Sequence, residues 1–238
     1  MRCTGPGEQG ASPQEGTTMT PPTMTPPTVT HHPIPAPAAA ATTADPAERV
    51  REHLRQSAAT KQRAVDSCAA DIAAAAGLIA ASYRAGSKLL LCGNGGSAAD
   101  CQHLAAEFVS RLTSDFERGS LPALSLATDT SFLTAFANDC GFDGVFARQV
   151  EGLGKPGDVL LGISTSGNSR NVILAAEAAR GRGITVIALV GRGGRLPRLA
   201  DVSIAVPCDN TQYIQECHLS IEHVLCAIVE RELFSAVC

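Results

Sequence analysis

The chain has 238 residues and a net charge of −4, with 19 Lys and Arg interspersed among 23 Asp and Glu. It contains two Tyr and no Trp, so it has neither a basic stripe nor an aromatic stacking surface, and nucleic-acid binding is disfavoured. The nine cysteines are an odd number, and six lie within apolar patterns, which predicts small buried side chains in a reducing compartment: Cys68, Cys92, Cys101, Cys140, Cys217 and Cys226.

Residues 1–44 differ in composition from the rest. They contain almost no large apolar side chain and include the near-repeats Thr18-Met-Thr-Pro-Pro and Thr23-Met-Thr-Pro-Pro. Such a segment buries too little surface to offset the entropy lost on ordering, so we expect a disordered Pro/Thr/Ala-rich tail, followed by one domain over 45–238. We expect no secretory signal in the tail and no run long enough to span a bilayer.

From residue 45 onward, helical and strand patterns alternate. Asp45-Pro46 suits a helix start, and Gly86 suits a helix end. Hydrophobic periodicity predicts two helices, 47–57 and 61–85, and then strands 88–92, 122–127, 158–163, 184–190 and 202–206 with helices 97–112, 130–137, 143–153, 168–181 and 211–234. This alternation predicts the α/β class, a doubly wound and mostly parallel five-stranded sheet with an N-terminal helical extension.

A glycine-rich loop follows the first predicted strand. It reads Gly93-Asn94-Gly95-Gly96-Ser97 and runs directly into a helix. Glycines let a ligand approach the main chain closely. The loop has no G-x-G-x-x-G pattern and no terminal Lys-Ser/Thr pair, so it matches neither common nucleotide fingerprint.

A hydroxyl-rich loop follows the third predicted strand. Ile163-Ser-Thr-Ser-Gly-Asn-Ser169 has more hydroxyl side chains than an N-cap needs, and hydroxyls with free backbone N–H groups suit a phosphate dianion. The carboxyl ends of parallel strands meet at one edge of a sheet, so both loops predict a site there for a phosphorylated small molecule. We interpret Gly191–Gly194 as a flexible turn rather than a third binding site.

The helix after the glycine-rich loop carries three polar side chains. His103, Glu107 and Arg111 are spaced by four residues, which places them on one helical face. A solvated polar stripe is the simpler interpretation, but the rest of the helix is mostly apolar and the stripe begins close to a ligand loop. A half-buried carboxylate beside an imidazole is a candidate proton-transfer or metal site.

The last predicted helix carries a second polar set within an apolar pattern. His218 fits a hydrogen-bonded structural histidine. Gln215 and His223 are eight positions apart, which is about 12 Å of helical rise. Both reach one ion only if Gln215 lies at a frayed helix start or if groups from different chains converge.

Four motifs occur in a fixed order between residues 47 and 235. They are Gly93-Asn-Gly-Gly-Ser97-x-x-Asp100-x-x-His103-x-x-x-Glu107, Asn138-Asp139-x-Gly-Phe142, Gly162-Ile-Ser-Thr-Ser-Gly-Asn-Ser169 and Ile214-Gln-Glu-x-His218-x-x-x-x-His223. Together they closely resemble the phosphoheptose isomerases (sedoheptulose-7-phosphate isomerases) of the sugar-isomerase, or SIS, fold. The resemblance implies interconversion of D-sedoheptulose 7-phosphate and D-glycero-D-manno-heptose 7-phosphate, the first step of activated heptose biosynthesis. It also implies a cytoplasmic, zinc-containing homotetramer with active sites between subunits. From the composition we expect no nucleic-acid or membrane partner.

The resemblance assigns roles position by position. Glu107 falls on the general base, which also contacts the substrate, and His223 falls on its acid–base partner. The implied zinc ligands are His103, Glu107, Gln215 and His223. The implied phosphate contacts are Ser97, Ser164, Thr165, Ser166 and Ser169, and the implied sugar contacts are Asn94, Gly95, Gly96, Asn138, Asp139 and Gln215. In such chemistry a carboxylate removes the proton beside the carbonyl, an enediol forms, and an imidazole moves protons between the oxygens.

Other functions stay open beside this one. A non-catalytic relative of the same fold, which binds a replication initiator, lacks the catalytic Glu and the late His, whereas both are present here at Glu107 and His223. Another sugar-phosphate isomerase or a sugar-phosphate sensor would share the hydroxyl loop, because hydroxyls select phosphate and not the sugar. Tyr213 stands where many relatives have Arg, so no basic contact is carried over to that position.

Overall fold

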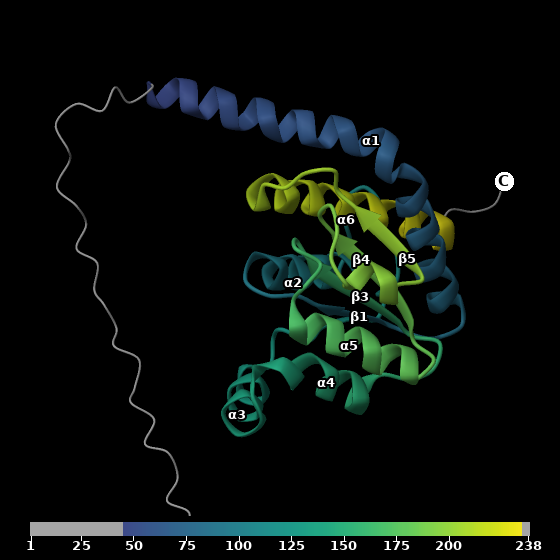
Figure 1. Cartoon of the computed structure of the whole chain (residues 1–238). Helices are drawn as coiled ribbons and strands as arrows, with labels where there is room; N and C mark the ends of the chain where they lie inside the picture. Colours follow the sequence, from purple (N-terminus) through teal and green to yellow (C-terminus); the bar gives the residue numbers. More distant parts are fainter. Residues whose placement is uncertain (1–44, 235–238) are drawn as a thin grey trace, which may run out of the picture. The chain divides into compact units, whose positions relative to one another are not determined.

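The computed structural model describes residues 45–234, which contain helices, short 3-10 turns and one sheet (Figure 1). The predicted tail, 1–44, and the last four residues, 235–238, lie outside the described residues. The disordered tail and the domain boundary at residue 45 therefore stay predictions.

Five strands form one sheet in which all neighbours are parallel, in the order β2-β1-β3-β4-β5. Their bounds are β1 Leu89–Cys92, β2 Ala123–Ser125, β3 Val159–Ser164, β4 Thr185–Val190 and β5 Val202–Ala205. The predicted doubly wound α/β sheet is confirmed. The strand order reverses between β1 and β3, and ligands of open α/β sheets bind beyond the carboxyl ends of the strands at such a switch point.

Helices cover both faces of the sheet (Figure 1). On one face lie α1 (Pro46–Arg84), α2 (Gly96–Val109) and α6 (Thr211–Phe234); on the other lie α4 (Val145–Leu153) and α5 (Arg170–Gly181). The remaining elements are α3 (Thr130–Cys140) and the 3-10 turns η1 (Phe142–Gly144) and η2 (Leu196–Leu199).

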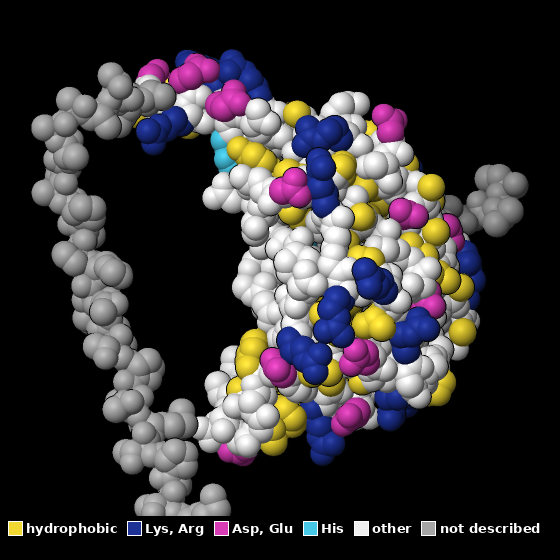
Figure 2. Space-filling view, in the orientation of Figure 1, with side chains coloured by type: hydrophobic (Ala, Val, Ile, Leu, Met, Phe, Trp, Pro, Cys, Tyr) yellow, Lys and Arg dark blue, Asp and Glu magenta, His cyan; other side chains and the backbone are white. Residues whose placement is uncertain are grey.

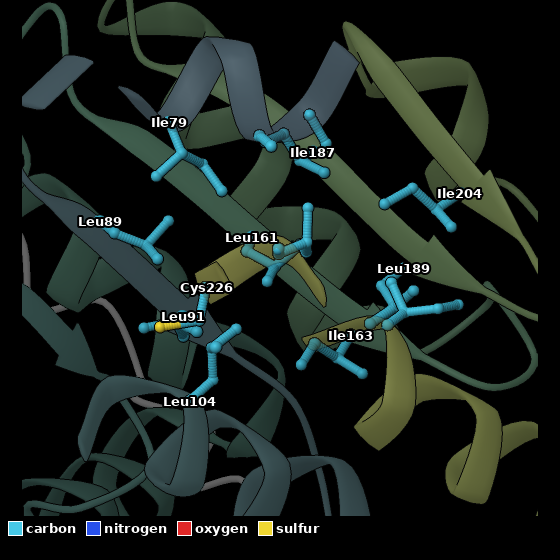
Figure 3. Close-up of a cluster of buried hydrophobic side chains, with 14 of the residues drawn as sticks. Ile79, Leu89, Leu91, Leu104, Leu161, Ile163, Ile187, Leu189, Ile204 and Cys226 are labelled. Carbon is cyan, nitrogen blue, oxygen red and sulfur yellow. The ribbon is translucent and has the colours of Figure 1, made fainter. Parts of the chain in front are cut away.

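Side chains alternate between two hydrophobic cores because successive residues of a strand point to opposite faces. Leu89 and Leu91 of β1 face α1, α2 and α6, whereas Leu90 and Cys92 face α4 and α5. Figure 3 shows the first core, where strand side chains meet side chains from α1, α2 and α6. On the face shown in Figure 2, Lys and Arg lie among Asp and Glu, as the sequence pattern predicts.

The N-terminal extension is one helix, α1, and not the two helices predicted from the sequence. No Gly or Pro interrupts residues 57–61. Thr60 Oγ1 donates to the carbonyl of Gln56 at 2.9 Å, and a bond of this kind can bend a helix without ending it. The predicted start is confirmed, because the Asp45 side chain accepts a hydrogen bond from the Ala47 N–H.

Helix α1 is also long and apolar enough to cross a membrane by length and composition, contrary to the expectation from sequence. Its many alanines give one 18-residue window of this helix a mean hydropathy of 1.5, and 33% of that window is buried. The buried residues Ala75, Ala76 and Ile79 pack into the first core. Core helices of soluble proteins pass the same test, so this feature is weak evidence for a membrane span.

Two local predictions are wrong. Helix α2 ends at Val109 and not near residue 112, so Arg111 leaves the face shared by His103 and Glu107, and its exposed side chain lies 3.6 Å from Glu117. Cys140 is exposed at the end of α3, whereas the other five cysteines singled out are buried.

Candidate active site

The glycine-rich and hydroxyl loops lie side by side at the carboxyl ends of β1 and β3. The two loops are joined by a pair of side-chain amides. Asn94 Nδ2 donates to Asn171 Oδ1 at 2.9 Å, and Asn171 Nδ2 donates to Asn94 Oδ1 at 2.8 Å. Asn171 is buried in the first turn of α5, so this pair holds the first loop against the helix that follows the second.

The hydroxyl loop presents its oxygens over a short distance. Ser164 Oγ lies 2.9 Å from Ser169 Oγ, and Ser169 is the N-cap of α5 without a side-chain bond to that helix. Thr165 and Ser166 line a hollow of about 250 Å³. Ser97, from the first loop, is buried at the start of α2. These positions suit an anion bound at two helix N-termini.

The Gly191–Gly194 loop supports the hydroxyl loop and is more than a turn. The Gly191 N–H donates to the Thr165 carbonyl at 3.1 Å. Gly167 has a φ of 64°, and a Cβ there would collide with the Gly193 carbonyl. Only glycine tolerates both conditions, so the two loops hold each other's shape.

A carboxylate and two imidazoles meet between α2 and α6. His103 Nε2 lies 2.8 Å from His223 Nε2, and His103 Nε2 lies 3.7 Å from Glu107 Oε1. The Glu107 side chain is 20% exposed and that of His103 is 41% exposed, so both are open to a ligand but partly shielded from water. Within a single chain, His103 therefore lies between the Glu107 carboxylate and the late-helix His223. A histidine from a neighbouring chain is therefore not needed at this point.

Gln215 lies at a different place along the same two helices. Its side-chain amide covers Gly96 so closely that a Cβ on Gly96 would clash with it. Helices α2 and α6 run parallel here, with Gly96 beside Gln215 at one end and His103 beside His223 further along. Gln215 lies inside α6, which begins at Thr211, so a frayed start does not bring it to His223.

The described structure does not bring Asn138 and Asp139 to the other candidates. Both are exposed in the last turn of α3, and Asn138 Nδ2 donates to Asp139 Oδ1 at 2.8 Å. Helix α3 has no fully buried residue, and only the partly buried Leu133, Phe136 and Ala137 pack it against the core that faces α4 and α5. Their contact with a sugar stays a prediction.

Buried acidic and imidazole groups lie beneath the site. Burial, followed by the charge of Asp100, raises the pKa of Glu222 to about 8. Burial also raises the pKa of Asp100. Burial lowers the pKa of His218 to about 4, and its Nε2 lies 3.2 Å from the Val190 carbonyl, as predicted for a structural histidine. Within the described residues neither carboxylate oxygen of Glu222 has a hydrogen-bond partner.

The predicted zinc ligands fit a metal by type but only in part by position. Imidazole nitrogens and carboxylate oxygens are common zinc ligands in proteins. However, no group of three His, Cys, Asp or Glu side chains in residues 45–234 is arranged to hold a metal ion. His103 and His223 are in direct hydrogen-bond contact, and Gln215 lies about 12 Å of helical rise from His223.

Comparisons with known proteins bear on this arrangement. Residues 52–191 match the family model described as the SIS domain. The chain is 55% identical over 158 residues to the phosphoheptose isomerase of Sulfurimonas denitrificans, covering 66% of this chain and 80% of the relative. It is 52% identical to that of Roseiflexus sp., covering 78% and 93%. The chain belongs to the phosphoheptose isomerase family.

Solved structures of phosphoheptose isomerases share the fold. That of Neisseria gonorrhoeae is 46% identical with a TM-score of 0.72, covering 77% of this chain and 97% of the other. That of Francisella tularensis is 35% identical with a TM-score of 0.76, covering 79% and 100%. The chain is accordingly an isomerase with the SIS fold, as the motifs predicted.

For a phosphoheptose isomerase, the sequence reasoning missed residues that hold the site together. No sequence pattern singles out Asn171, because it follows the hydroxyl loop as an ordinary helix residue, although its buried amide faces Asn94. Asp100 belongs to the first motif, and in the structure it is half-buried with its charge close enough to act on Glu222. Tyr213, at the departure from many relatives, has its ring 5.0 Å from that of His53 on α1.

Proposed function

We propose that the chain interconverts D-sedoheptulose 7-phosphate and D-glycero-D-manno-heptose 7-phosphate. The observation that carries the proposal is the contact among His103, Glu107 and His223 beside the loops at the carboxyl ends of β1 and β3. A carboxylate 3.7 Å from one imidazole, which in turn contacts a second imidazole at 2.8 Å, supplies the groups that aldose–ketose isomerisation needs. The family relationship supports the choice of a heptose phosphate.

In this mechanism Glu107 removes the proton from the carbon beside the carbonyl, and the product of that step is an enediol. His223 then moves a proton between the two adjacent oxygens, and Glu107 returns its proton to the neighbouring carbon. His103 orients His223 through the 2.8 Å contact between their Nε2 atoms. The hydroxyls of Ser164, Thr165, Ser166 and Ser169, with Ser97, hold the phosphate.

We also propose zinc as the cofactor, held by His103, Glu107 and His223, with Gln215 joining from a neighbouring chain. The support is the donor set and the distance that separates Gln215 from His223 within one chain. A zinc ion supplies Lewis-acid polarisation of a carbonyl oxygen. The zinc content of purified protein should be close to one per chain and should fall in His223→Ala; equal content in both proteins contradicts this assignment.

We further propose that the protein is a cytoplasmic homotetramer without nucleic-acid or membrane partners. A hollow of about 410 Å³ between α1 and α6 is lined mainly by apolar side chains, including Val65, Ile72 and Val224. Val65 is 56% exposed and Val224 is 45% exposed, so this face suits contact with another chain. Light scattering should give four times the mass of the chain, and a monomer would contradict the assembly.

The function is tested by incubating the pure protein with sedoheptulose 7-phosphate and measuring aldose phosphate. Wild-type protein should form it, and Glu107→Gln should lose roughly 10²–10⁴-fold in turnover, because its amide cannot take the proton. Glu177→Gln is the matched control, since it makes the same substitution at an exposed position of α5. Wild-type turnover by a folded Glu107→Gln protein would rule out Glu107 as the general base.

The non-catalytic alternative predicts a different outcome. A replication-initiator-binding relative has no need of a carboxylate in contact with an imidazole pair, and this chain has that contact. No aldose phosphate from wild-type protein, under conditions where the tetramer is intact, would favour that alternative over the enzyme.

A further inference from the structure

The side chain of Arg118 is fully buried although it lies in the irregular segment between α2 and β2. Its partner is Glu230 on α6, whose side chain is 3% exposed. Arg118 Nη2 lies 2.6 Å from Glu230 Oε1, and Nε donates to the same oxygen at 2.7 Å. The Leu112 N–H also donates to that oxygen at 3.1 Å. Buried charges persist only when they are paired and hydrogen-bonded in this way.

The rest of the Arg118 guanidinium binds the end of α2. Nη2 donates to the Glu107 carbonyl at 2.7 Å, and Nη1 donates to the Phe108 carbonyl at 2.7 Å and to the Gly119 carbonyl at 2.9 Å. The last carbonyls of a helix have no partner inside the helix, so Arg118 satisfies two of them. All five N–H groups of the guanidinium face an acceptor.

The buried Arg118 side chain, which we call the Arg118 anchor, binds Glu107, the residue whose carboxylate faces His103. The Glu107 carbonyl is bound to Arg118, and Arg118 is bound to Glu230 on the helix that also carries His223. We propose that Arg118 is a positioning residue that sets the Glu107 carboxylate against the His103–His223 pair. The inference rests on the proposed function, because it assigns a geometric role within the same reaction.

The physical reason is the place of Glu107 in its helix. Glu107 lies in the last turn of α2, which ends at Val109, and last turns fray unless their carbonyls are bound. A displacement of about 1 Å in a reacting group can lower turnover about 10²-fold. Lysine cannot replace this anchor, because one ammonium does not span two carbonyls and a carboxylate as a planar guanidinium does.

The test measures kcat and KM for sedoheptulose 7-phosphate in Arg118→Lys and Glu230→Gln, at a temperature where each variant is folded. We expect kcat to fall about 10- to 100-fold while KM changes by less than about threefold, because binding groups stay in place and the base is displaced. Lys88→Met is the matched control. Lys88 pairs with buried Asp158 at the amino ends of β1 and β3, opposite the site, so its loss should lower Tm and leave kcat unchanged.

The outcomes separate this inference from the proposed function. An Arg118→Lys protein with wild-type kcat and a Tm as low as that of Lys88→Met would overturn the positioning role. If Arg118→Lys does not fold, the kcat-against-KM result for Glu230→Gln decides in the same way. A wild-type protein without isomerase activity overturns the proposed function and this inference with it, whereas an active wild type with unimpaired variants overturns this inference alone.

Discussion

The buried imidazole of His218 shows how one residue couples packing to pH. Burial holds the pKa of His218 at about 4 in the folded chain, whereas the group titrates near 6.5 when unfolded. Between these values the unfolded chain binds a proton that the folded chain does not bind. The contribution of neutral His218 to the free energy of unfolding is therefore complete above pH 6.5, and it decreases as the pH falls toward about 4.

We expect the free energy of unfolding to fall by up to roughly 3 kcal/mol between pH 6.5 and about 4 through His218. His218→Leu should show a flatter pH profile over that window, because the titrating group is gone. The Val190 carbonyl keeps its bond from the Val206 N–H in that variant. Urea unfolding at several pH values measures the difference, in which the opposite contribution of Glu222 cancels. Equal slopes in both proteins would show that His218 is not the cause.

At the scale of elements, the hydroxyl loop and the Gly191–Gly194 loop can pack against each other only because glycines stand at their contact. Gly167 combines a φ of 64° with direct contact against Gly193, and the Arg195 and Leu196 N–H groups both donate to the Gly167 carbonyl at 2.9 Å. The hydroxyl loop therefore takes its shape from a second loop that lies about 25 residues further along the chain.

Gly167→Ala should cost at least about 1–2 kcal/mol of stability, because a left-handed backbone and a collision with a carbonyl act together. We also expect KM for the sugar phosphate to rise, since the hydroxyls move. Gly77→Ala in α1 is the control, because Gly77 is helical with open space around it and alanine there should stabilise by about 0.5–1 kcal/mol. Thermal melts and initial rates measure both effects. A Gly167→Ala protein as stable as Gly77→Ala would contradict the account of the loops.

At the scale of the whole molecule, the structure divides the candidate zinc ligands between two places. His103, Glu107 and His223 meet within one chain, whereas Gln215 covers Gly96. If Gln215 completes the same site, it comes from another chain of the proposed tetramer.

Mixing variants after subunit exchange tests this division. Glu107→Gln mixed with His223→Ala should regain no activity, because one chain supplies both groups to each site. Glu107→Gln mixed with Gln215→Ala should regain part of it, because a site can take Glu107 from one chain and Gln215 from the other. Mass spectrometry of mixed assemblies controls for exchange. Recovery in the first mixture, or none in the second, would reverse the assignment.

Much of the fold followed from the sequence by itself. The apolar run of β3 and the hydroxyls of Ser164–Ser169 identify a buried strand that opens into an anion-binding turn, because those properties depend on neighbouring residues. The spacing of His103 and Glu107 also fixed their shared helical face, since a helix has one geometry wherever it lies. The four ordered motifs then gave the family.

Tertiary structure decided what depends on partners distant in the chain. The Asn94–Asn171 amide pair, the His103–His223 contact and the Arg118 anchor each link segments whose meeting no local pattern encodes. Arg118 illustrates the reason: in sequence it is one charged residue in a polar loop, and only its burial against α2 and α6 shows which carbonyls it binds. Burial and pairing are properties of the packed molecule, so the pKa values and the precise site geometry arise only there.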